Sequence, residues 1–353
     1  MTRRFERCAL VVAIGLVVGL CGAAYLNPPR MVTAAPQAML DLPPLEIDVA
    51  SGWTPSVGEL AVIHVNAAGS EDLTKTVSVR ARDTQHMASA KHTAAGLWQT
   101  FERLGYDLNA VGSGDAEVPR LFVASLPKDL SEVRETARRK ALFFSSVLPL
   151  VLQVNDEISA DRERLWELRS RLMKGAKLGP VDRLWLIVMA ERYQVKRGDL
   201  KSLVSRVDAI PPSLALAQAA EESGWGTSRF VRQGNAIFGQ WTFSTDGSLV
   251  PAQRDTDKFH RVKAFGSLLD SVRAYARNLN THRAYRHFRK ERRDMRRQNL
   301  PLDGIKLADN LKSYSERGEG YIKDLRAIIA ANKLRRLDGA RLSPRMAKAG
   351  SLI

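Results

Sequence analysis

One glutamate at the end of a predicted helix has the surroundings that acid catalysis needs. Residues 211–222 open with two prolines and continue through small and apolar residues to Glu222, and Gly224 and Gly226 end the helix. Gln218 lies one turn before Glu222 on the same helical face. Partial burial and the carbonyl end of the helix both disfavour a carboxylate, which predicts a raised pKa for Glu222. A carboxyl group that stays protonated near neutral pH can act as a general acid, although a solvated cap or an ion pair is the commoner role for a glutamate taken alone.

Other kinds of catalytic site lack their usual residues. The chain has two cysteines, Cys8 and Cys21, and both lie in or beside an apolar run at the amino terminus. No thiol is therefore left for a metal centre, a redox pair or a cysteine nucleophile elsewhere. The six histidines lack the His-Glu-x-x-His spacing of zinc hydrolases, and no Gly-x-Ser-x-Gly or glycine-rich nucleotide motif occurs. The sequence predicts no metal site and no cofactor.

Most of the elements that must position Glu222 are predicted helices. The 353 residues are enough for a substantial core without disulfide or metal support. Pro149 lies inside the first helical pattern and predicts a kink or a break there. Apolar residues recur every three to four positions after residue 128, which predicts helices at 133–151, 165–172, 180–193, 199–207, 267–280, 285–298, 305–315 and 320–334.

A short segment between these helices has a different pattern. Residues 235–265 are polar and aromatic, alternate in places, and contain Asp246-Gly247, which is a hairpin turn signal. We therefore expect a mainly helical domain with a small β-hairpin lobe over residues 129–340, followed by a frayed tail at 341–353. Upstream, residues 58–128 predict a small α/β segment with a helix at 94–104 and a strand at 120–124.

The amino terminus has the features of an export signal. Three arginines precede an apolar stretch at residues 9–26, which is long enough to span a bilayer. We expect residues 1–26 to form a signal anchor in the inner membrane, with a cleaved signal peptide as the alternative. The Pro- and Ala-rich residues 27–57 predict a stalk. The rest of the chain is then expected to be periplasmic or otherwise extracytoplasmic.

The charge of the chain favours anionic partners. Lys and Arg number 54 against 38 Asp and Glu, a net charge of +16, which attracts anionic polymers or lipids. Residues 283–297, from Arg283 to Arg297, are especially basic and predict either a solvated helix face or an anchor on anionic wall or lipid phosphate. Because an exported chain does not meet the chromosome, we expect no nucleic acid partner.

Two stretches of the sequence resemble one bacterial enzyme family. Residues 216–226 read Leu-Ala-Gln-Ala-Ala-Glu-Glu-Ser-Gly-Trp-Gly, and residues 235–239 read Asn-Ala-Ile-Phe-Gly. This pair is similar to motifs of the glucosaminidase family, glycoside hydrolase family 73, which includes flagellar hydrolases and autolysins, and within it to the bacterial Bax-like proteins. The likeness covers about two thirds of the chain and continues through residues 271–285 and 311–321.

The resemblance implies a fold, an activity and a set of site residues. It implies an α+β, mainly α, lysozyme-like fold and hydrolysis of β-1,4 bonds after N-acetylglucosamine in the glycan strands of peptidoglycan, with Glu222 as the acid. Tyr321 matches the late tyrosine of the family, with Tyr314 as its neighbour, and either is expected to hydrogen-bond the acetamido group of the sugar. The residues expected on the substrate side of the cleft are Asn235, Phe238 and Gly239.

The second catalytic group is open. Glycosidases usually pair their acid with a second carboxylate, and family members offer a glutamate on the hairpin after Asn-x-x-Phe-Gly. This chain has no glutamate between Glu222 and Glu291. Asp257 and Asp255 are the remaining candidates, and without them the acetamido oxygen of the substrate is expected to act as nucleophile.

Aromatic side chains near the two motifs are candidates for stacking on sugar rings, although aromatic residues at such spacings also form cores. They are Trp225, Phe238, Trp241, Phe243 and Tyr275. Two alternatives to the hydrolase remain: a lytic transglycosylase on the same scaffold, and a non-catalytic protein that binds the cell wall.

Overall fold

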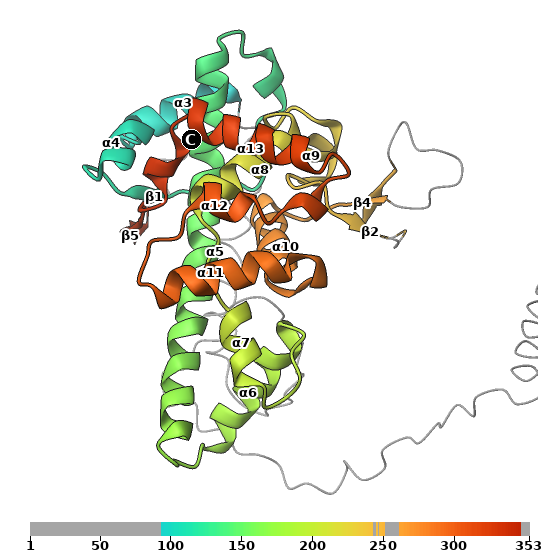
Figure 1. Ribbon diagram of the computed structural model, residues 1–353. Helices are drawn as coiled ribbons and strands as arrows, with labels where there is room; N and C mark the ends of the chain where they lie inside the picture. Colours follow the sequence, from blue (N-terminus) through green and yellow to red (C-terminus); the bar gives the residue numbers. More distant parts are fainter. Residues whose placement is uncertain (1–92, 243–244, 246, 251–260, 347–353) are drawn as a thin grey trace, which may run out of the picture. The chain divides into compact units, whose positions relative to one another are not determined.

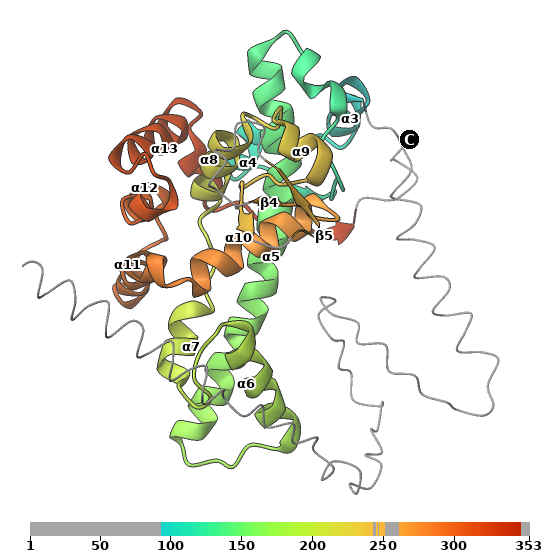
Figure 2. The same cartoon turned by 90° about the vertical axis from the view of Figure 1, so that its right-hand side faces the viewer.

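One long helix, α5 (Thr136–Met173), is the element around which the others pack (Figures 1 and 2). The computed structural model describes residues 93–346 except 243–244, 246 and 251–260. The middle of α5, from Leu142 to Leu152, is buried, because helices α8 and α10 and strand β1 contact it. The helix does not break at Pro149, which lies within this buried stretch. Packing on several sides stabilises the helix across the backbone hydrogen bond that proline cannot make.

Shorter helices surround α5, and most have clear sequence caps. Thr93, Asp107, Asp199, Ser267 and Asp303 each accept a backbone N–H at a helix start. The helices are α3 (Ala94–Arg103), α4 (Leu108–Ser113), α6 (Pro180–Arg192), α7 (Leu200–Arg206), α8 (Pro212–Ser223), α9 (Arg229–Gly234), α10 (Leu268–Thr281), α11 (Arg286–Arg297), α12 (Gly304–Ala308) and α13 (Glu319–Ala331). Single 3-10 turns lie at η2 (Lys128–Glu132), η3 (Arg283–Tyr285), η4 (Lys312–Tyr314) and η5 (Leu334–Leu337).

Two small sheets complete the described fold. Strands β2 (Trp241–Thr242), β4 (Arg261–Lys263) and β3 (Ser248–Leu249) form an antiparallel sheet in the order β2-β4-β3. Strand β1 (Val118–Arg120) pairs in parallel with β5 (Leu342–Met346). The predicted class, a mainly helical α+β fold with a small β lobe, is confirmed.

Several predicted boundaries differ from the structure. The strand expected at 120–124 is β1, which is shorter and earlier, and the helix expected at 305–315 is divided into α12 and η4. The boundary predicted at residue 128 falls inside a packed unit, because α3, α4 and β1 share the hydrophobic core with α5 and α8. The tail predicted from residue 341 includes β5, which β1 holds by main-chain pairing. Because Val118 pairs with Leu342, far away in the sequence, the residues near β5 alone give little indication of a strand.

Helix α5 is long and apolar enough to cross a membrane, but it is mostly buried within the protein. It is therefore a core helix. The predicted anchor at 9–26, the stalk at 27–57 and residues 58–92 lie outside the described residues, so these interpretations stay predictions.

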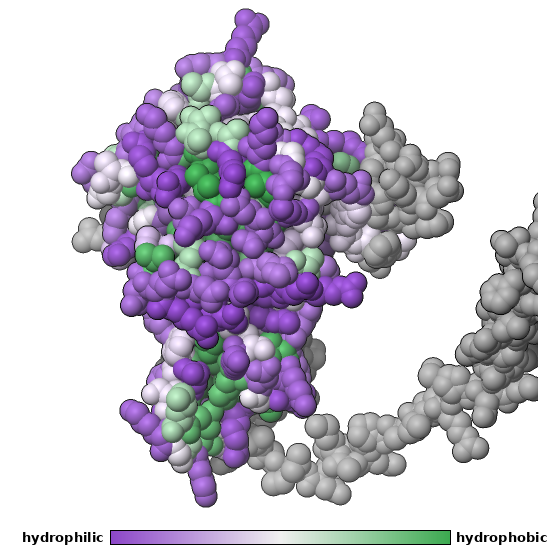
Figure 3. Space-filling model, viewed as in Figure 1, coloured by the Kyte–Doolittle hydropathy of each residue, from purple (hydrophilic) through white to green (hydrophobic). Residues whose placement is uncertain are grey.

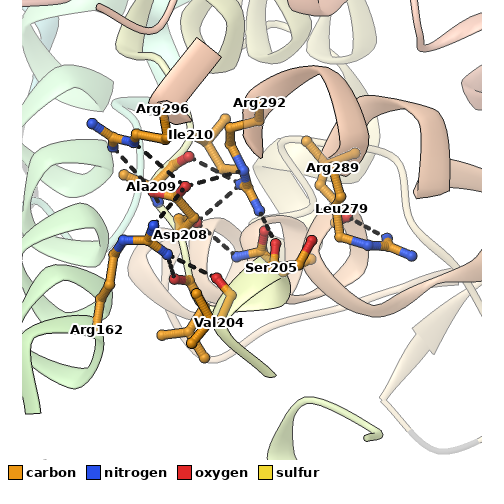
Figure 4. A network of polar contacts seen from close by, with 12 residues as sticks. Arg162, Val204, Ser205, Asp208, Ala209, Ile210, Leu279, Arg289, Arg292 and Arg296 are labelled. Atoms are coloured by element: carbon orange, nitrogen blue, oxygen red, sulfur yellow. Dashed lines mark hydrogen bonds and ion pairs between the residues drawn. The ribbon is translucent and has the colours of Figure 1, made fainter. Parts of the chain in front are cut away.

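A buried ion cluster fixes the segment that leads into α8 (Figure 4). The carboxylate of Asp208 lies 3.0 Å from Arg296, 3.6 Å from Arg162 and 3.7 Å from Arg292. Arg292 is fully buried and also donates to the carbonyl oxygens of Asp208 and Ala209, both at 3.0 Å. Helices α5 and α11 are thereby tied to one short segment.

The same cluster corrects the interpretation of Arg283–Arg297 as one basic face. Arg289 and Arg292 are buried, and Arg289 donates to the carbonyl oxygens of Leu279 and His282 at 2.9 Å. Arg296 pairs with Asp208. Because these three cations hold the fold together, the surface charge of α11 is smaller than its sequence indicates.

Candidate active site

Glu222 lies in the last turn of α8, directly after a fully buried stretch of that helix. Residues 214–220 of α8 have no exposed surface, and α5, α12, α13 and η5 pack against this helix. The alanines between Leu214 and Glu222 leave room for these neighbours. Gly224 ends the helix in the left-handed conformation with φ +56°. The structure therefore holds the Glu222 side chain on a rigid backbone.

Burial raises the pKa of Glu222 to about 7. Removal of water around the carboxylate is the main cause, and the negative charge of Glu221 adds to it. A hydrogen bond from Tyr321 and the positive charge of Arg317 act in the opposite direction, because both stabilise the carboxylate. The opposing effects leave Glu222 able both to donate and to accept a proton near neutral pH.

A chain of buried polar groups reaches Glu222 from the core. The Tyr275 hydroxyl donates to Oε1 of Gln218 at 2.7 Å, and Nε2 of Gln218 donates to the Tyr321 hydroxyl at 2.9 Å. The Tyr321 hydroxyl is hydrogen-bonded to Glu222. Since Gln218 occupies the Tyr321 oxygen as donor, the tyrosine proton is directed at the carboxylate. This order fixes both the position and the hydrogen-bonding direction of the acid.

Two further tyrosines line the same region. The rings of Tyr314 and Tyr321 are parallel with centroids 5.7 Å apart, and those of Tyr285 and Tyr314 are 5.9 Å apart. The Tyr314 hydroxyl donates to the carbonyl oxygen of Phe238 at 3.3 Å. Burial raises the pKa of Tyr285 to about 12 and that of Tyr314 well above its usual value, and the charge of Glu222 contributes to both. These hydroxyls therefore stay neutral beside the acid.

The segment 235–239 crosses close to the acid. A side chain added at Gly239 would place its Cβ 3.4 Å from Oε2 of Glu222, and Gly239 has φ +58°. Asn235 ends α9 in the left-handed conformation, and its Nδ2 donates to the carbonyl oxygen of Phe265 at 3.3 Å. The motif thus brings a backbone without a side chain to Glu222 and ties that backbone to the segment after β4.

The aromatic candidates separate into core and surface residues. Phe238 and Tyr275 are each 1% exposed and stack on each other, with ring centroids 3.8 Å apart. They form core contacts, which corrects the expectation that they stack on sugars. Trp225 packs against Phe144 at 5.3 Å. Trp241, on β2, is 61% exposed and is the most exposed of the described aromatic candidates.

The carboxylates around Glu222 have different situations. Glu221 forms an ion pair with Arg317, with an oxygen-to-nitrogen distance of 2.5 Å. Its carboxylate therefore has a structural partner. Asp255 and Asp257 lie outside the described residues, as does Phe243. No group of three or more His, Cys, Asp or Glu able to hold a metal ion occurs in the part of the chain that the structure describes.

Sequence reasoning assigned no role to two residues that the site uses. Gln218 was recognisable by its position one turn before Glu222 on the same helix face, but its two tyrosine partners lie 57 and 103 residues away. Tyr285 was indicated only by its position in residues 271–285, which resemble the glucosaminidase family.

A cavity of about 580 Å³ lies elsewhere, between α3, α4, α5 and η5, with Trp98, Tyr106, Lys140 and Arg336 among its lining residues. No predicted site residue lines it.

The comparisons with known proteins match the part of the chain that contains this site. A family model described as mannosyl-glycoprotein endo-beta-N-acetylglucosaminidase matches residues 200–334, which contain Glu222, segment 235–239 and all four tyrosines. The chain is 35% identical to Protein bax of Escherichia coli (strain K12) over 216 residues, which is 60% of this chain and 75% of that protein. No solved structure matches the chain significantly.

Proposed function

Because the chain belongs to the glucosaminidase family of glycosidases and is Bax-like within it, we propose that it hydrolyses the β-1,4 bond after N-acetylglucosamine in peptidoglycan glycan strands. The observation that carries the proposal is Glu222, a half-buried carboxyl group with a pKa of about 7, whose Oε2 would lie 3.4 Å from a Cβ added at Gly239. A glycosidase acid needs this combination of a retained proton and access for the sugar.

The proposed reaction begins at the glycosidic oxygen. Protonated Glu222 donates its proton to that oxygen while the bond from the oxygen to the anomeric carbon breaks, and the leaving sugar departs with a neutral hydroxyl group. Glu222 is then a carboxylate, which the Tyr321 hydroxyl stabilises by hydrogen bonding. The Tyr321 hydroxyl thus stabilises the Glu222 carboxylate, formed after proton transfer, more than it stabilises the protonated acid.

The group that acts at the anomeric carbon is proposed to come from the β lobe. Asp257 or Asp255 serves there either as the base that takes a proton from water attacking the anomeric carbon or as the nucleophile whose glycosyl ester water then cleaves. Otherwise the acetamido oxygen of the substrate attacks, and water then opens the ring that this attack forms. Asp257→Asn and Asp255→Asn, assayed singly, separate these cases: loss of turnover in one variant identifies the carboxylate, and full turnover in both assigns the role to the acetamido group.

The remaining site residues are proposed to hold substrate. Trp241, which is 61% exposed, is proposed to stack on a sugar face, and Tyr314 is proposed to hydrogen-bond the acetamido group. Tyr321 is 1% exposed and its hydroxyl is held by Gln218 and Glu222, so its proposed role is to tune the acid. Asn235 and Phe238 support the segment that carries Gly239. Trp225 supports the helix end from its contact with α5.

Digestion of purified sacculi followed by mass spectrometry tests the activity. The full chain is expected to release fragments with new reducing N-acetylglucosamine ends, and Glu222→Gln is expected to release none. Glu221→Gln is the matched control, since it removes the neighbouring carboxylate from the same turn. Anhydromuramic ends would assign a lytic transglycosylase instead. Binding of sacculi without fragments from either protein would assign a non-catalytic wall protein.

We further propose that residues 9–26 hold the protein at the inner membrane with its catalytic domain on the extracytoplasmic side, where peptidoglycan lies. A carboxyl-terminal reporter that is active only outside the cytoplasm tests this orientation. The surface proposed for anionic wall or lipid phosphate consists of exposed cations on η3 and α11, namely Arg283, Arg286, Lys290 and Arg297.

A further inference from the structure

Exposed apolar side chains gather at one end of the described structure, away from Glu222. Nine large hydrophobic residues are exposed in the described part of the chain, and six of them lie on the last turns of α5 and on α6. Met173 is 73% exposed, Val181 66% and Leu184 62%. Figure 3 shows apolar surface over this part of α5 and α6. The six residues, which we call the apolar tip, are Trp166, Leu172, Met173, Val181, Leu184 and Val188.

The hairpin that carries the apolar tip is held together by ion pairs. Asp182 of α6 lies 3.2 Å from Arg164 and 3.1 Å from Arg171 of α5, and Asp161 of α5 lies 3.1 Å from Arg192 of α6. Only Met189 and Ala190 of α6 are buried. The exposed apolar residues therefore add little to the packing of the hairpin, and a cluster of this kind indicates a contact surface.

The charges around the outer part of the apolar tip are mainly positive, while Glu163 and Glu167 are exposed acids beside Trp166 at its inner end. Between residues 168 and 190 the chain has five Lys and Arg residues and a single acid, Asp182, which two arginines neutralise. Lys174, Lys177 and Arg183 are exposed beside Met173, Val181 and Leu184. Long cationic side chains on the rim of an apolar surface complement anionic lipid headgroups.

Tryptophans lie on the rim as well. The guanidinium of Arg169 lies 4.8 Å from the ring of Trp166, which is 42% exposed, and that of Arg164 lies 4.8 Å from the ring of Trp185. Tryptophan is enriched at the boundary between the acyl chains and the headgroups of a bilayer, where its ring is partly apolar and partly polar. Lipid therefore matches the apolar centre, the aromatic rim and the cationic edge together.

We propose that the apolar tip inserts into the headgroup region of an anionic lipid bilayer. Met173, Val181 and Leu184 enter the apolar boundary, while the neighbouring cations contact lipid phosphates. Phe143 of α5 packs against Trp225, three residues after Glu222, and the helix rises about 45 Å from residue 143 to residue 173 at 1.5 Å per residue. A hairpin docked by its tip would hold the acid tens of ångströms from the lipid along that helix.

A fluorescent probe on the tip tests the contact in the full chain. Cys8→Ser and Cys21→Ser leave a background without thiols, in which Met173→Cys or the control Leu300→Cys carries an environment-sensitive dye; Leu300 is 41% exposed and lies outside the hairpin. The chain is reconstituted in vesicles of phosphatidylcholine alone or with one third phosphatidylglycerol. Any membrane segment in residues 1–26 is common to all samples.

The proposal requires a difference between the two probe positions. Quenching by a lipid-borne quencher is expected to be several-fold stronger at position 173 than at 300 in anionic vesicles, and Leu184→Glu is expected to weaken insertion of the 173 probe about tenfold or more. Equal quenching at both positions, or no dependence on phosphatidylglycerol, overturns it. A dye shift that follows protein concentration without lipid overturns it in favour of contact between two copies. Turnover of soluble muropeptides by Leu184→Glu reports the proposed hydrolase separately.

Discussion

The Tyr321 hydroxyl is expected to set the upper pH limit of activity. Tyr321→Phe removes the hydrogen bond that stabilises the Glu222 carboxylate and leaves the ring in place. A hydrogen bond to a charged group contributes about 1.5–3 kcal/mol, and each pKa unit corresponds to about 1.36 kcal/mol. The pKa of Glu222, about 7 in the native protein, should therefore rise by about one to two units.

The sign of the effect follows from the proposed role of Glu222 as the acid. Glu222 must be protonated to donate, so turnover falls as the pH rises through its pKa. In Tyr321→Phe this alkaline limb should move to higher pH by about one to two units. The plateau rate at lower pH should fall, because the carboxylate formed in the reaction has lost its donor and the acid is weaker.

The measurement is release of muropeptides from sacculi across a series of buffers at constant ionic strength. Tyr314→Phe is the matched control. The Tyr314 ring stacks on the Tyr321 ring, but the Tyr314 hydroxyl donates to the carbonyl oxygen of Phe238. Its alkaline limb should stay in place even if its rate falls. A limb in Tyr321→Phe that stays in place or moves to lower pH would refute the assignment of Glu222 as an acid tuned by Tyr321.

Three further predictions follow from the same structure. The raised pKa of Glu222 contributes stability that is fully present below the pKa of glutamate in the unfolded chain and is lost as the pH rises through about 7. Glu222→Gln should therefore be more stable than the native protein at pH 8.5, by about 2–3 kcal/mol in chemical unfolding. Equal stability of the two proteins at that pH would contradict the raised pKa. Gly239→Ala should lose most activity, whereas Gly247→Ala, with the same backbone strain at φ +59° and open space around it, should lose about 1 kcal/mol of stability and keep its activity. Asp208→Ala should lower the free energy of unfolding by about 3–5 kcal/mol, and the exposed Asp156→Ala by less than about 1 kcal/mol; similar losses in urea unfolding would argue against the buried cluster.

The sequence could predict what depends on short spacings. Helical periodicity and the prolines at 211–212 gave the bounds of α8 closely, and Gly224 marked its end, so the place of Glu222 on the fold was predictable. The direction of its pKa shift was also predictable from burial.

Contacts between distant residues were not predictable in this way. Arg292 and Arg296 appear in the sequence as part of a basic run, yet both bind Asp208, more than 80 residues earlier. Phe238 and Tyr275 appear as candidates for sugar stacking, but they stack on each other across 37 positions. Periodicity reports which side of a helix is apolar, whereas it says nothing of which partner covers that side.

The pKa of Glu222 results from two sets of effects that oppose each other. Burial alone would hold the proton of Glu222 too tightly for efficient transfer, because a good catalytic acid has a pKa near the working pH. The Tyr321 hydroxyl and Arg317 lower the pKa, while desolvation and Glu221 raise it. Since Gln218 holds the Tyr321 hydroxyl and Tyr275 holds Gln218, the balance depends on groups that are buried in the core. A change at Gln218 should therefore alter the pH dependence of turnover more than it alters the binding of glycan.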